Sequence, residues 1–261
     1  RLPSVTATPA EPPSLALTGE RTLPGIPDEN YWFQRHVVAY RLAAAAAGHR
    51  VVLDAGCGEG YGLRMLALAG ARRVVGADLE PDVVAHARAA YAADDRVEVH
   101  ACELMALPLA DDEVDLTVSF QVIEHLHDIP GYLASLRRVT RPGGEVWIAT
   151  PNRLTFTPDS DVPVNPFHTR EFTADELRDE LEAAGLRVAT VLGVHHGPVL
   201  RGVELATRAT VPDLLTRSDP ADWPRWVRSL VHRVTPDHFT VHDRDLDASL
   251  DLLAVARVPR G

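Results

Sequence analysis

Residues 51–62 read VVLDAGCGEGYG, and this stretch decides the fold. Its first five residues are a short apolar run, as in a buried parallel strand. Gly56, Gly58 and Gly60 follow at alternate positions, and a helical pattern begins at Tyr61. Glycines between a strand and a helix let a ligand approach the main chain closely. The stretch therefore predicts a nucleotide-binding turn at the end of a central strand.

The spacing and the charge of this turn narrow the class of ligand. The dinucleotide pattern G-x-G-x-x-G fails, because its third glycine, counted from Gly56, would be Tyr61. Asp54 and Glu59 flank the glycines, so a pyrophosphate would be repelled and a positive charge attracted. Asp78 ends the next predicted strand, where a carboxylate can accept hydrogen bonds from both ribose hydroxyls. A nucleoside with a cationic tail and no phosphate, such as S-adenosylmethionine, fits these features.

Apolar runs typical of strands alternate with helical patterns along the rest of the chain. This alternation predicts an α/β protein with a Rossmann-like, seven-stranded, mostly parallel sheet and helices on both of its faces. A helix expected near residues 130–140 ends at a break, Arg141-Pro142-Gly143-Gly144. The seven expected strands are residues 51–55, 73–78, 97–101, 114–120, 145–150, 187–194 and 250–257.

The chain is expected to divide into three parts. Residues 1–30 hold six of the 20 prolines and are expected to form an extended N-terminal segment. Residues 31–200 and 241–258 form the nucleotide-binding core. Residues 201–240 have no clear strand pattern, and a loop of that length inside a compact domain is usually functional. We expect a helical lid over the substrate, inserted before the last strand; a decoration that covers the sheet edge is the alternative.

Composition restricts the partners of the chain. Among its 261 residues, 26 basic and 37 acidic side chains give a formal net charge of −11, which argues against electrostatic binding of nucleic acid or anionic membrane. No apolar run approaches the roughly 18 residues of a membrane span, and no signal peptide is visible. Its two cysteines, Cys57 and Cys102, indicate a reducing, cytoplasmic location. We expect a small molecule as substrate, and a homodimer stays open.

Three motifs together resemble class I S-adenosylmethionine-dependent methyltransferases. They are Asp54-x-Gly56-x-Gly58-x-Gly60, Asp78, and Arg141-Pro142-Gly143-Gly144 before a strand. The resemblance covers residues 36–195 and implies a Rossmann-like fold with S-adenosylmethionine as cofactor. The cofactor-binding residues that it implies are Asp54, Gly56, Gly58, Gly60, Asp78, Leu79, Glu103, Leu104 and Gln121.

The resemblance also assigns parts of the cofactor to individual residues. Asp54 would lie near the methionine ammonium group, and the glycines would line the methionine tail. Asp78 would bind the ribose, Leu79 would pack on the adenine, and Glu103 would accept a hydrogen bond from the adenine amino group. Gln121 would face the methionine end of the cofactor.

Segments in the flanks resemble a narrower group, the 1-O-methyltransferases of mycobacterial methylmannose polysaccharide biosynthesis. These segments are GER at 19–21, ENYWF at 29–33, NRLTF at 152–156, NPFHTRE at 165–171 and HDRD at 242–245. The resemblance implies methyl transfer to the reducing-end 1-OH of a short, already methylated mannoside. The candidate substrate residues are Tyr31, Asn152, Arg153, Asn165, His168, Arg170 and His242.

A histidine follows the fourth predicted strand, at the sheet edge where ligands bind in such folds. Methyl transfer to a hydroxyl requires loss of the hydroxyl proton, and His125 is the best-placed general base. Similar O-methyltransferases carry Glu-x-x-Glu-His here and bind a divalent ion, whereas this chain has Gln121 in the first position. A metal site of Glu124, His125 and His168, with Mg²⁺ as a second cofactor, stays open beside the plain base. A third option is that Glu124 and His125 form only a structural turn.

Two other functions remain open from the sequence. One is O-methylation of a quinone-like or other aromatic molecule, which would need apolar pocket walls. The other is a non-catalytic subunit that binds S-adenosylmethionine; the intact glycine turn and Asp78 argue against it. Polar side chains in the loops, such as Asn165 and His168, favour a sugar as the acceptor.

Overall fold

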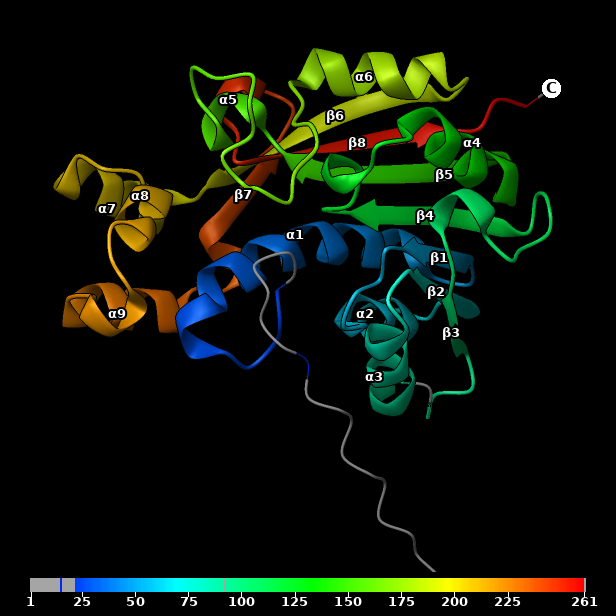
Figure 1. Cartoon of the computed structure of the whole chain (residues 1–261), viewed down its shortest axis with the longest axis horizontal. Coiled ribbons are helices and arrows are strands. Elements are labelled where there is room, and N and C mark those ends of the chain that lie inside the picture. The colour runs from blue at the N-terminus through cyan, green and yellow to red at the C-terminus, as the bar shows by residue number, and fades with distance from the viewer. Residues whose placement is uncertain (1–14, 16–21, 92, 261) are drawn as a thin grey trace, which may run out of the picture.

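Eight strands form one sheet in the computed structural model, which describes residue 15, residues 22–91 and residues 93–260 (Figure 1). The strand order is β3-β2-β1-β4-β5-β8-β6-β7. The strands are β1 Val51–Ala55, β2 Arg73–Asp78, β3 Val97–Ala101, β4 Val114–Phe120, β5 Thr140–Pro151, β6 Arg187–His196, β7 Phe239–His242 and β8 Asp251–Arg257.

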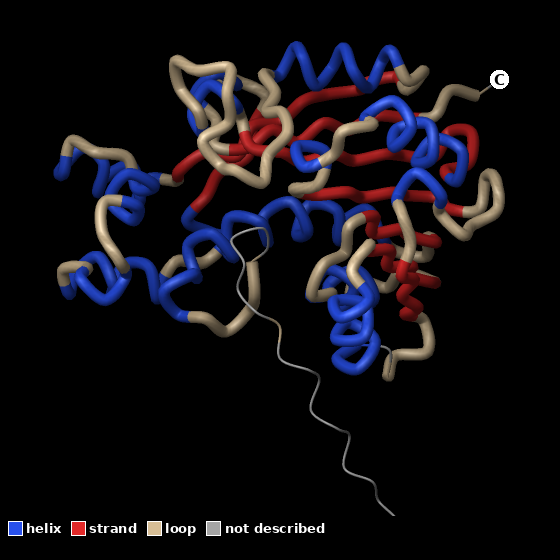
Figure 2. Tube along the Cα trace, viewed as in Figure 1, coloured by secondary structure: helices blue, strands red, loops and turns tan. Residues whose placement is uncertain are grey.

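Helices cover both faces of the sheet (Figure 2). The described α-helices are α1 Asn30–Ala47, α2 Tyr61–Leu68, α3 Pro81–Tyr91, α4 Ile129–Val139, α5 Arg153–Phe156, α6 Ala174–Ala183, α7 Pro198–Thr207, α8 Val211–Thr216 and α9 Arg225–Arg233. The described 3-10 helices are η1 Pro27–Glu29, η2 Leu104–Ala106, η3 Ile123–His125, η4 Pro220–Asp222, η5 Pro236–His238 and η6 Leu246–Ala248. α4 and α6 pack against one face of the sheet through Tyr132 and Leu177, respectively. α1 and α2 pack against the other face through Tyr40 and Leu63, respectively. The prediction of helices on both faces is confirmed.

The sheet is parallel on one side and antiparallel on the other. The five strands from β3 to β5 in the sheet order pair in parallel. β8 runs antiparallel to both β5 and β6, and β7 runs antiparallel to β6. The expected mostly parallel sheet is confirmed, but the expected number of seven strands is one too low. The additional strand is β7, whose four residues are too few to show an alternating pattern and straddle the expected boundary between the lid and the core at residues 240 and 241.

The expected break at residues 141–144 lies inside a strand. β5 already begins at Thr140, which pairs with Val114, and regular pairing resumes where Glu145 faces Leu116. The register shift between these two pairs is a bulge that accommodates the extra residues. Gly143 has a φ of +78°, a conformation that side-chain-bearing residues rarely adopt. The glycines therefore bend β5 at its start instead of separating it from α4.

A helical insertion lies between β6 and β8 and consists of α7, α8, α9 and the strand β7. The side-chain amide of Asn30, at the start of α1, donates to the carbonyls of Val231 at 2.8 Å and Val234 at 2.9 Å. Tyr31, Trp223 and other apolar side chains fill the space between α1 and α9. The insertion before the last strand is thus present and attached to α1, while its action as a lid stays a prediction.

Of the expected N-terminal segment, residues 1–30, the structure describes residue 15 and residues 22–30. Residues 1–14 and 16–21, which include the GER motif, lie outside the described residues. Pro27–Glu29 forms the short helix η1, which leads directly into α1. None of the described helices is both long and apolar enough to cross a membrane.

Candidate active site

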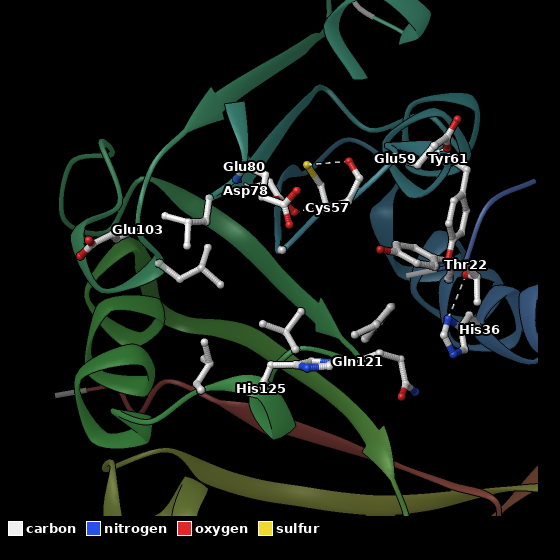
Figure 3. Close-up of a pocket in the computed structure, with 18 of the residues that line it drawn as sticks. Thr22, His36, Cys57, Glu59, Tyr61, Asp78, Glu80, Glu103, Gln121 and His125 are labelled. Carbon is white, nitrogen blue, oxygen red and sulfur yellow. Dashed lines mark hydrogen bonds between the residues drawn. The ribbon is translucent and has the colours of Figure 1, made fainter. Parts of the chain in front are cut away.

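A pocket of about 370 Å³ opens at the carboxyl ends of β1, β2 and β4 (Figure 3). Its walls come from the turns that follow the first four strands and from α1. The strand order reverses between β1 and β4, and ligands of doubly wound folds bind at that reversal. The volume lies within the range of small-molecule sites.

The glycine turn forms one wall of this pocket. Gly56 has a φ of +82°, and a Cβ atom added there would lie 2.4 Å from a methyl group of Val122, so a side chain at this position would strain the backbone and displace Val122. Gly56 and Gly58 line the pocket, and their contact with the cofactor stays a prediction. Gly60 does not line it: an added Cβ atom would lie 2.8 Å from the ring of Tyr91 in α3. This geometry favours a role for Gly60 in packing α2 against α3.

Four further predicted cofactor residues line one end of the pocket. Asp78 accepts a hydrogen bond from the main-chain N–H of Gly58 at 2.9 Å, which fixes its carboxylate beside the glycine turn. Leu79 is 62% exposed and presents an apolar surface next to it. Glu103 and Leu104 follow β3 and complete this end. A carboxylate, an apolar surface and a second carboxylate are what a ribose with an attached base would require.

Asp54 lies behind the pocket wall, not on it. Its side chain is fully buried, and the hydroxyl of Tyr40 donates to the two carboxylate oxygens at 3.1 and 3.2 Å. Burial raises the pKa of Asp54 to about 7, against the lowering effect of the Tyr40 hydrogen bond. Asp54 is not among the residues that line the pocket, so direct contact with a ligand ammonium group stays a prediction.

Glu59, the second carboxylate of the glycine turn, lines the pocket but is engaged with neighbouring side chains. Its Oε1 atom accepts a hydrogen bond from the hydroxyl of Tyr91 at 2.7 Å and lies 3.1 Å from Nε2 of His86. Its Oε2 atom accepts from the main-chain N–H of Tyr61 at 3.0 Å, at the start of α2. Glu59 therefore joins the glycine turn to α2 and α3.

Gln121 stands at the turn after β4 in a strained backbone conformation. Its φ is +59°, which a residue other than glycine adopts only when the surrounding structure holds it. Its N–H donates to the carbonyl of Ala149 at 2.8 Å. Its side-chain amide lies 3.4 Å from Oδ1 of the buried Asp251. Gln121 lines the pocket, and its contact with the methionine end of the cofactor stays a prediction.

Sequence reasoning missed the contribution of α1 to the pocket. His36 and Tyr40, four residues apart on one face of α1, line the pocket together with Thr22. The Thr22 hydroxyl is hydrogen-bonded to Nδ1 of His36 at 3.2 Å. Burial lowers the pKa of His36 to about 4, so its imidazole is neutral at pH 7. The helical spacing of the two polar aromatic residues was a usable signal, but only the folded chain shows that this face meets the glycine turn.

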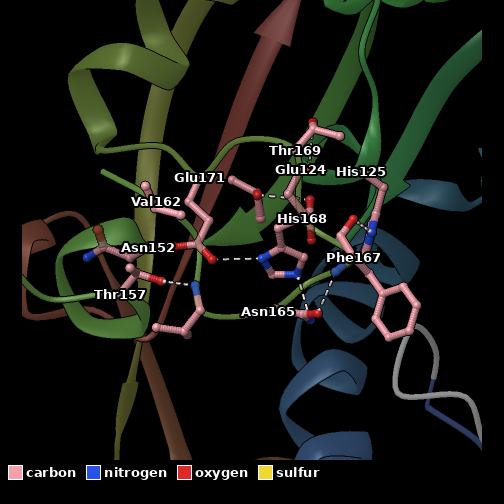
Figure 4. A network of polar contacts seen from close by, with 12 residues as sticks. Glu124, His125, Asn152, Thr157, Val162, Asn165, Phe167, His168, Thr169 and Glu171 are labelled. Atoms are coloured by element: carbon pink, nitrogen blue, oxygen red, sulfur yellow. Dashed lines mark hydrogen bonds and ion pairs between the residues drawn. The ribbon is translucent and has the colours of Figure 1, made fainter. Parts of the chain in front are cut away.

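His125, the predicted base, lines the pocket from η3. Its Nδ1 atom lies 3.0 Å from the carbonyl oxygen of Phe167 (Figure 4). A carbonyl can only accept, so Nδ1 carries the proton. In the neutral ring, Nε2 is then the atom that can accept a proton.

His168 lies next to His125, with the two ring centres 5.0 Å apart. Its Nδ1 atom is 2.8 Å from Oε1 of Glu171, so this nitrogen donates. Its Nε2 atom is 3.1 Å from Nδ2 of Asn165, which donates to it (Figure 4). A carboxylate behind a histidine is the arrangement that orients metal-ligating histidines in proteins.

Glu124 completes the predicted metal cluster. The Thr150 hydroxyl donates to its Oε2 atom at 2.9 Å, whereas its buried Oε1 atom has no hydrogen-bond partner among the described residues. Burial raises the pKa of Glu124 to about 8. Candidate ligand atoms of Glu124, His125 and His168 all lie within 4.8 Å of one another. Two imidazole nitrogens and one orphaned carboxylate oxygen fit a divalent cation if Nε2 of His168 exchanges its hydrogen bond from Asn165 for the ion, because Nδ1 of His168 carries the proton.

Two predicted substrate residues are enclosed in the protein. Tyr31 is fully buried, and its hydroxyl is hydrogen-bonded to Nε2 of His196 at 2.7 Å. Asn152 is also fully buried, and its amide donates to main-chain carbonyls that include Ser249 at 2.9 Å. Neither side chain is available to a ligand in this structure. Each satisfies buried polar groups of neighbouring elements, and contact of either residue with a substrate stays a prediction.

Three further predicted substrate residues are engaged with other side chains, outside the pocket lining. Arg153 forms ion pairs with Asp161 and Glu176. Arg170 pairs with Glu180. His242 stacks on His195, with the ring centres 4.0 Å apart. Of the seven predicted substrate residues, only Asn165 and His168 belong to the cluster beside His125.

Comparisons with known proteins bear on the identity of this pocket. A protein-family model described as a methyltransferase domain matches residues 53–148. A probable S-adenosylmethionine-dependent methyltransferase of Mycolicibacterium smegmatis is 46% identical over 255 residues, which cover 96% of this chain and 98% of that protein. The chain belongs to the S-adenosylmethionine-dependent methyltransferases. S-adenosylmethionine is accordingly the methyl donor of this methyltransferase.

Other similarities of the methyltransferase are more distant. A ubiquinone biosynthesis O-methyltransferase of Sinorhizobium medicae is 29% identical over 160 residues, which cover 57% of the methyltransferase and 64% of that protein. A methyltransferase solved in complex with the Trm112 activator of Haloferax volcanii superposes with a TM-score of 0.63 at 22% identity, covering 90% and 93% of the two chains. The latter similarity shows that the two proteins share the α/β Rossmann-like methyltransferase fold.

Proposed function

We propose that the methyltransferase transfers the methyl group of S-adenosylmethionine to a sugar hydroxyl. The acceptor that we favour is the reducing-end 1-OH of a short, methylated mannoside, as the sequence resemblance implies. One observation carries the proposal of an oxygen acceptor: Nδ1 of His125, a residue that lines the pocket, donates to the Phe167 carbonyl, so Nε2 is the ring nitrogen at which the neutral imidazole can accept a proton.

The reaction then has a simple balance. The acceptor oxygen attacks the methyl carbon in line with the sulfur, a C–O bond forms and the C–S bond breaks. The hydroxyl proton passes to Nε2 of His125, and S-adenosylhomocysteine leaves with the former bonding electrons on sulfur. A positioned base of this kind contributes a rate factor of about 10² to 10⁴.

The pocket orients the cofactor for this transfer. Asp78, Leu79 and Glu103 form the end that suits the ribose and adenine. The methionine part would then run along Gly56 and Gly58 toward Gln121. This direction brings the sulfonium close to the turn after β4, where His125 lies.

The residues beside His125 also fit a divalent cation, for which we propose Mg²⁺. Glu124, His125 and His168 would hold it, with Glu171 orienting His168. When bound, such an ion lowers the pKa of a coordinated hydroxyl and orients it. His125 cannot use the same nitrogen as ligand and as base, so the two versions of the site are alternatives.

An aromatic, quinone-like acceptor is the second candidate. The name of the Sinorhizobium medicae relative places that protein in ubiquinone biosynthesis. Phe167, whose carbonyl holds His125, is 41% exposed, and Val162 and Val164 of the same loop are also exposed. These apolar side chains suit an aromatic ring, but they suit the methyl ethers of a methylated sugar as well.

A panel of acceptors separates these proposals. We would incubate the full chain with methyl-labelled S-adenosylmethionine and Mg²⁺, and with methylated and unmethylated mannosides or a catechol. Label at the 1-OH of a methylated mannoside is the expected result, and label on the catechol alone would overturn the sugar assignment. His125→Ala should remove most of the turnover, whereas His127→Ala, an exposed residue of the same segment, should not.

Binding without transfer to any acceptor would favour the non-catalytic subunit instead. A homodimer and a cytoplasmic location stay predictions from the sequence. Sedimentation of the purified chain tests the first of them.

A further inference from the structure

A short segment, residues 165–170, forms hydrogen bonds with the main chain on both sides of His125 (Figure 4). The hydroxyl of Thr169 donates to the carbonyl of Leu126 at 2.8 Å and to that of Glu124 at 3.1 Å. The N–H of Thr169 also donates to the carbonyl of Glu124, at 2.7 Å. Thr169 therefore binds the residue before His125 and the residue after it.

The same segment supplies the carbonyl that His125 contacts. Phe167 lies two residues before Thr169, and its oxygen is 3.0 Å from Nδ1 of His125. Within the segment, the N–H of Phe167 donates to the side-chain oxygen of Asn165 at 3.0 Å. The N–H of His168 donates to the main-chain carbonyl of Asn165 at 3.1 Å. These bonds make a compact turn, so the place of Thr169 sets the place of the Phe167 oxygen.

We propose that Thr169 is a positioning residue that keeps His125 in the tautomer with the proton on Nδ1. The inference deepens the proposed function, because it rests on His125 as the group that accepts the acceptor proton. A neutral histidine that carries its proton on Nε2 cannot accept another there. The Phe167 carbonyl favours the tautomer of His125 that can accept a proton at Nε2. Thr169 keeps that carbonyl within hydrogen-bonding distance of Nδ1 of His125.

Direct observation of the tautomer is the first test. Long-range ¹H–¹⁵N NMR of the full chain with S-adenosylhomocysteine distinguishes a protonated from an unprotonated ring nitrogen, and His125→Gln assigns the signals. In the wild type we expect a protonated Nδ1 and an unprotonated Nε2. A protonated Nε2 as the main form in the wild type would overturn the proposal without any variant.

Two substitutions at Thr169 then test the cause. Thr169→Val keeps the shape and the N–H bond but removes both hydroxyl bonds, whereas Thr169→Ser keeps the hydroxyl. We expect Thr169→Val to show a mixture of tautomers and a fall in kcat of about tenfold, with less than about a twofold change in KM for S-adenosylmethionine. Thr169→Ser should restore both readouts to nearly wild-type values.

A matched control separates this effect from general loss of stability. The Thr216 hydroxyl donates to the carbonyl of Pro212 at 3.0 Å at an exposed position of α8, far along the chain from the residues that line the pocket. Thr216→Val should change neither the tautomer nor kcat. If Thr169→Val matches the wild type in both readouts, Thr169 does not position His125.

The tautomer measurement needs no sugar acceptor. If the tautomer depends on Thr169 and no mannoside is methylated, the proposed acceptor fails and the positioning role stands. If mannosides are methylated and the tautomer is indifferent to Thr169, the positioning role fails and the proposed function stands.

Discussion

Arg35 and Asp251 form a bidentate ion pair behind Gln121, which lines the pocket. Nε of Arg35 donates to Oδ2 at 2.5 Å, and Nη2 donates to Oδ1 at 2.6 Å. Both side chains are 4% exposed, and Oδ1 also lies 3.4 Å from the side-chain amide of Gln121. The pair joins α1 to the start of β8 and supports Gln121 from behind.

Removal of one partner should leave a buried charge without compensation. We expect Asp251→Asn to lower the free energy of unfolding by about 3–5 kcal/mol, as for other broken buried pairs. Urea unfolding followed by circular dichroism measures the change. As a control, Asp237→Asn breaks the exposed pair with Arg41 and should cost about 1 kcal/mol or less. Equal losses in the two variants would contradict the importance of burial.

Asp78 should contribute to binding of the cofactor through the ribose hydroxyls. Asp78→Ala leaves those hydroxyls without their acceptor and also frees the N–H of Gly58. We expect a loss of about 1–3 kcal/mol in affinity for S-adenosylhomocysteine, measured by calorimetry. The exposed Asp95, replaced in the same way, should leave the affinity unchanged. An unaltered affinity of Asp78→Ala would remove this residue from the cofactor site.

Asp54 should make stability depend on pH. Burial raises its pKa from 3.8 to about 7, so between these values the folded state holds a proton that the unfolded state has lost. Its contribution to stability is therefore present below 3.8 and is lost as pH rises to about 7. Asp54→Asn should gain stability relative to the wild type from about pH 4 to about pH 7, measured by urea unfolding of the cofactor-free protein. A constant difference across this range would contradict the raised pKa of Asp54.

If Glu124, His125 and His168 hold a divalent cation, methylation should depend on that ion. Treatment with EDTA should stop methylation of the acceptor, and Mg²⁺ should restore it, with no change in affinity for S-adenosylhomocysteine. His168→Ala should lose the response to Mg²⁺, because it removes one of three ligands. Methylation that is indifferent to EDTA in the wild type would leave His125 as a plain base.

Local sequence patterns correctly predicted the strands β1 and β2 and the turns that directly follow them. The apolar run before Gly56 and the acidic Asp78 at the next strand end lie in the structure where the pattern indicates, at neighbouring parallel strands. His36 and Tyr40 were missed, because only the packing of α1 over the glycine turn brings them to the pocket. An added Cβ atom on Gly62 would lie 2.1 Å from the Tyr40 ring, which shows how closely these distant segments approach.

Polar residues in loops were the least predictable part of the site. Asn152 and Asn165 both lie outside the strands, yet Asn152 donates to main-chain carbonyls in the interior whereas Asn165 contacts His168. A polar side chain that completes buried hydrogen bonds and one that meets a ligand are chemically the same. The difference lies in long-range packing, which one sequence does not display.

The short strand β7 has a consequence for how this chain could be shortened. It pairs with β6 from Gly193 to His196 and so occupies the outer main-chain donors and acceptors of that strand. A deletion that extended through β7 would leave β6 as a bare edge, and bare edges recruit strands from other molecules. Such a truncated chain should form edge-to-edge aggregates, whereas a deletion that spared β7 should stay dispersed. The sheet of the truncated chain would end in the ten-residue β6 instead of the four-residue β7, and a longer edge recruits strands more readily.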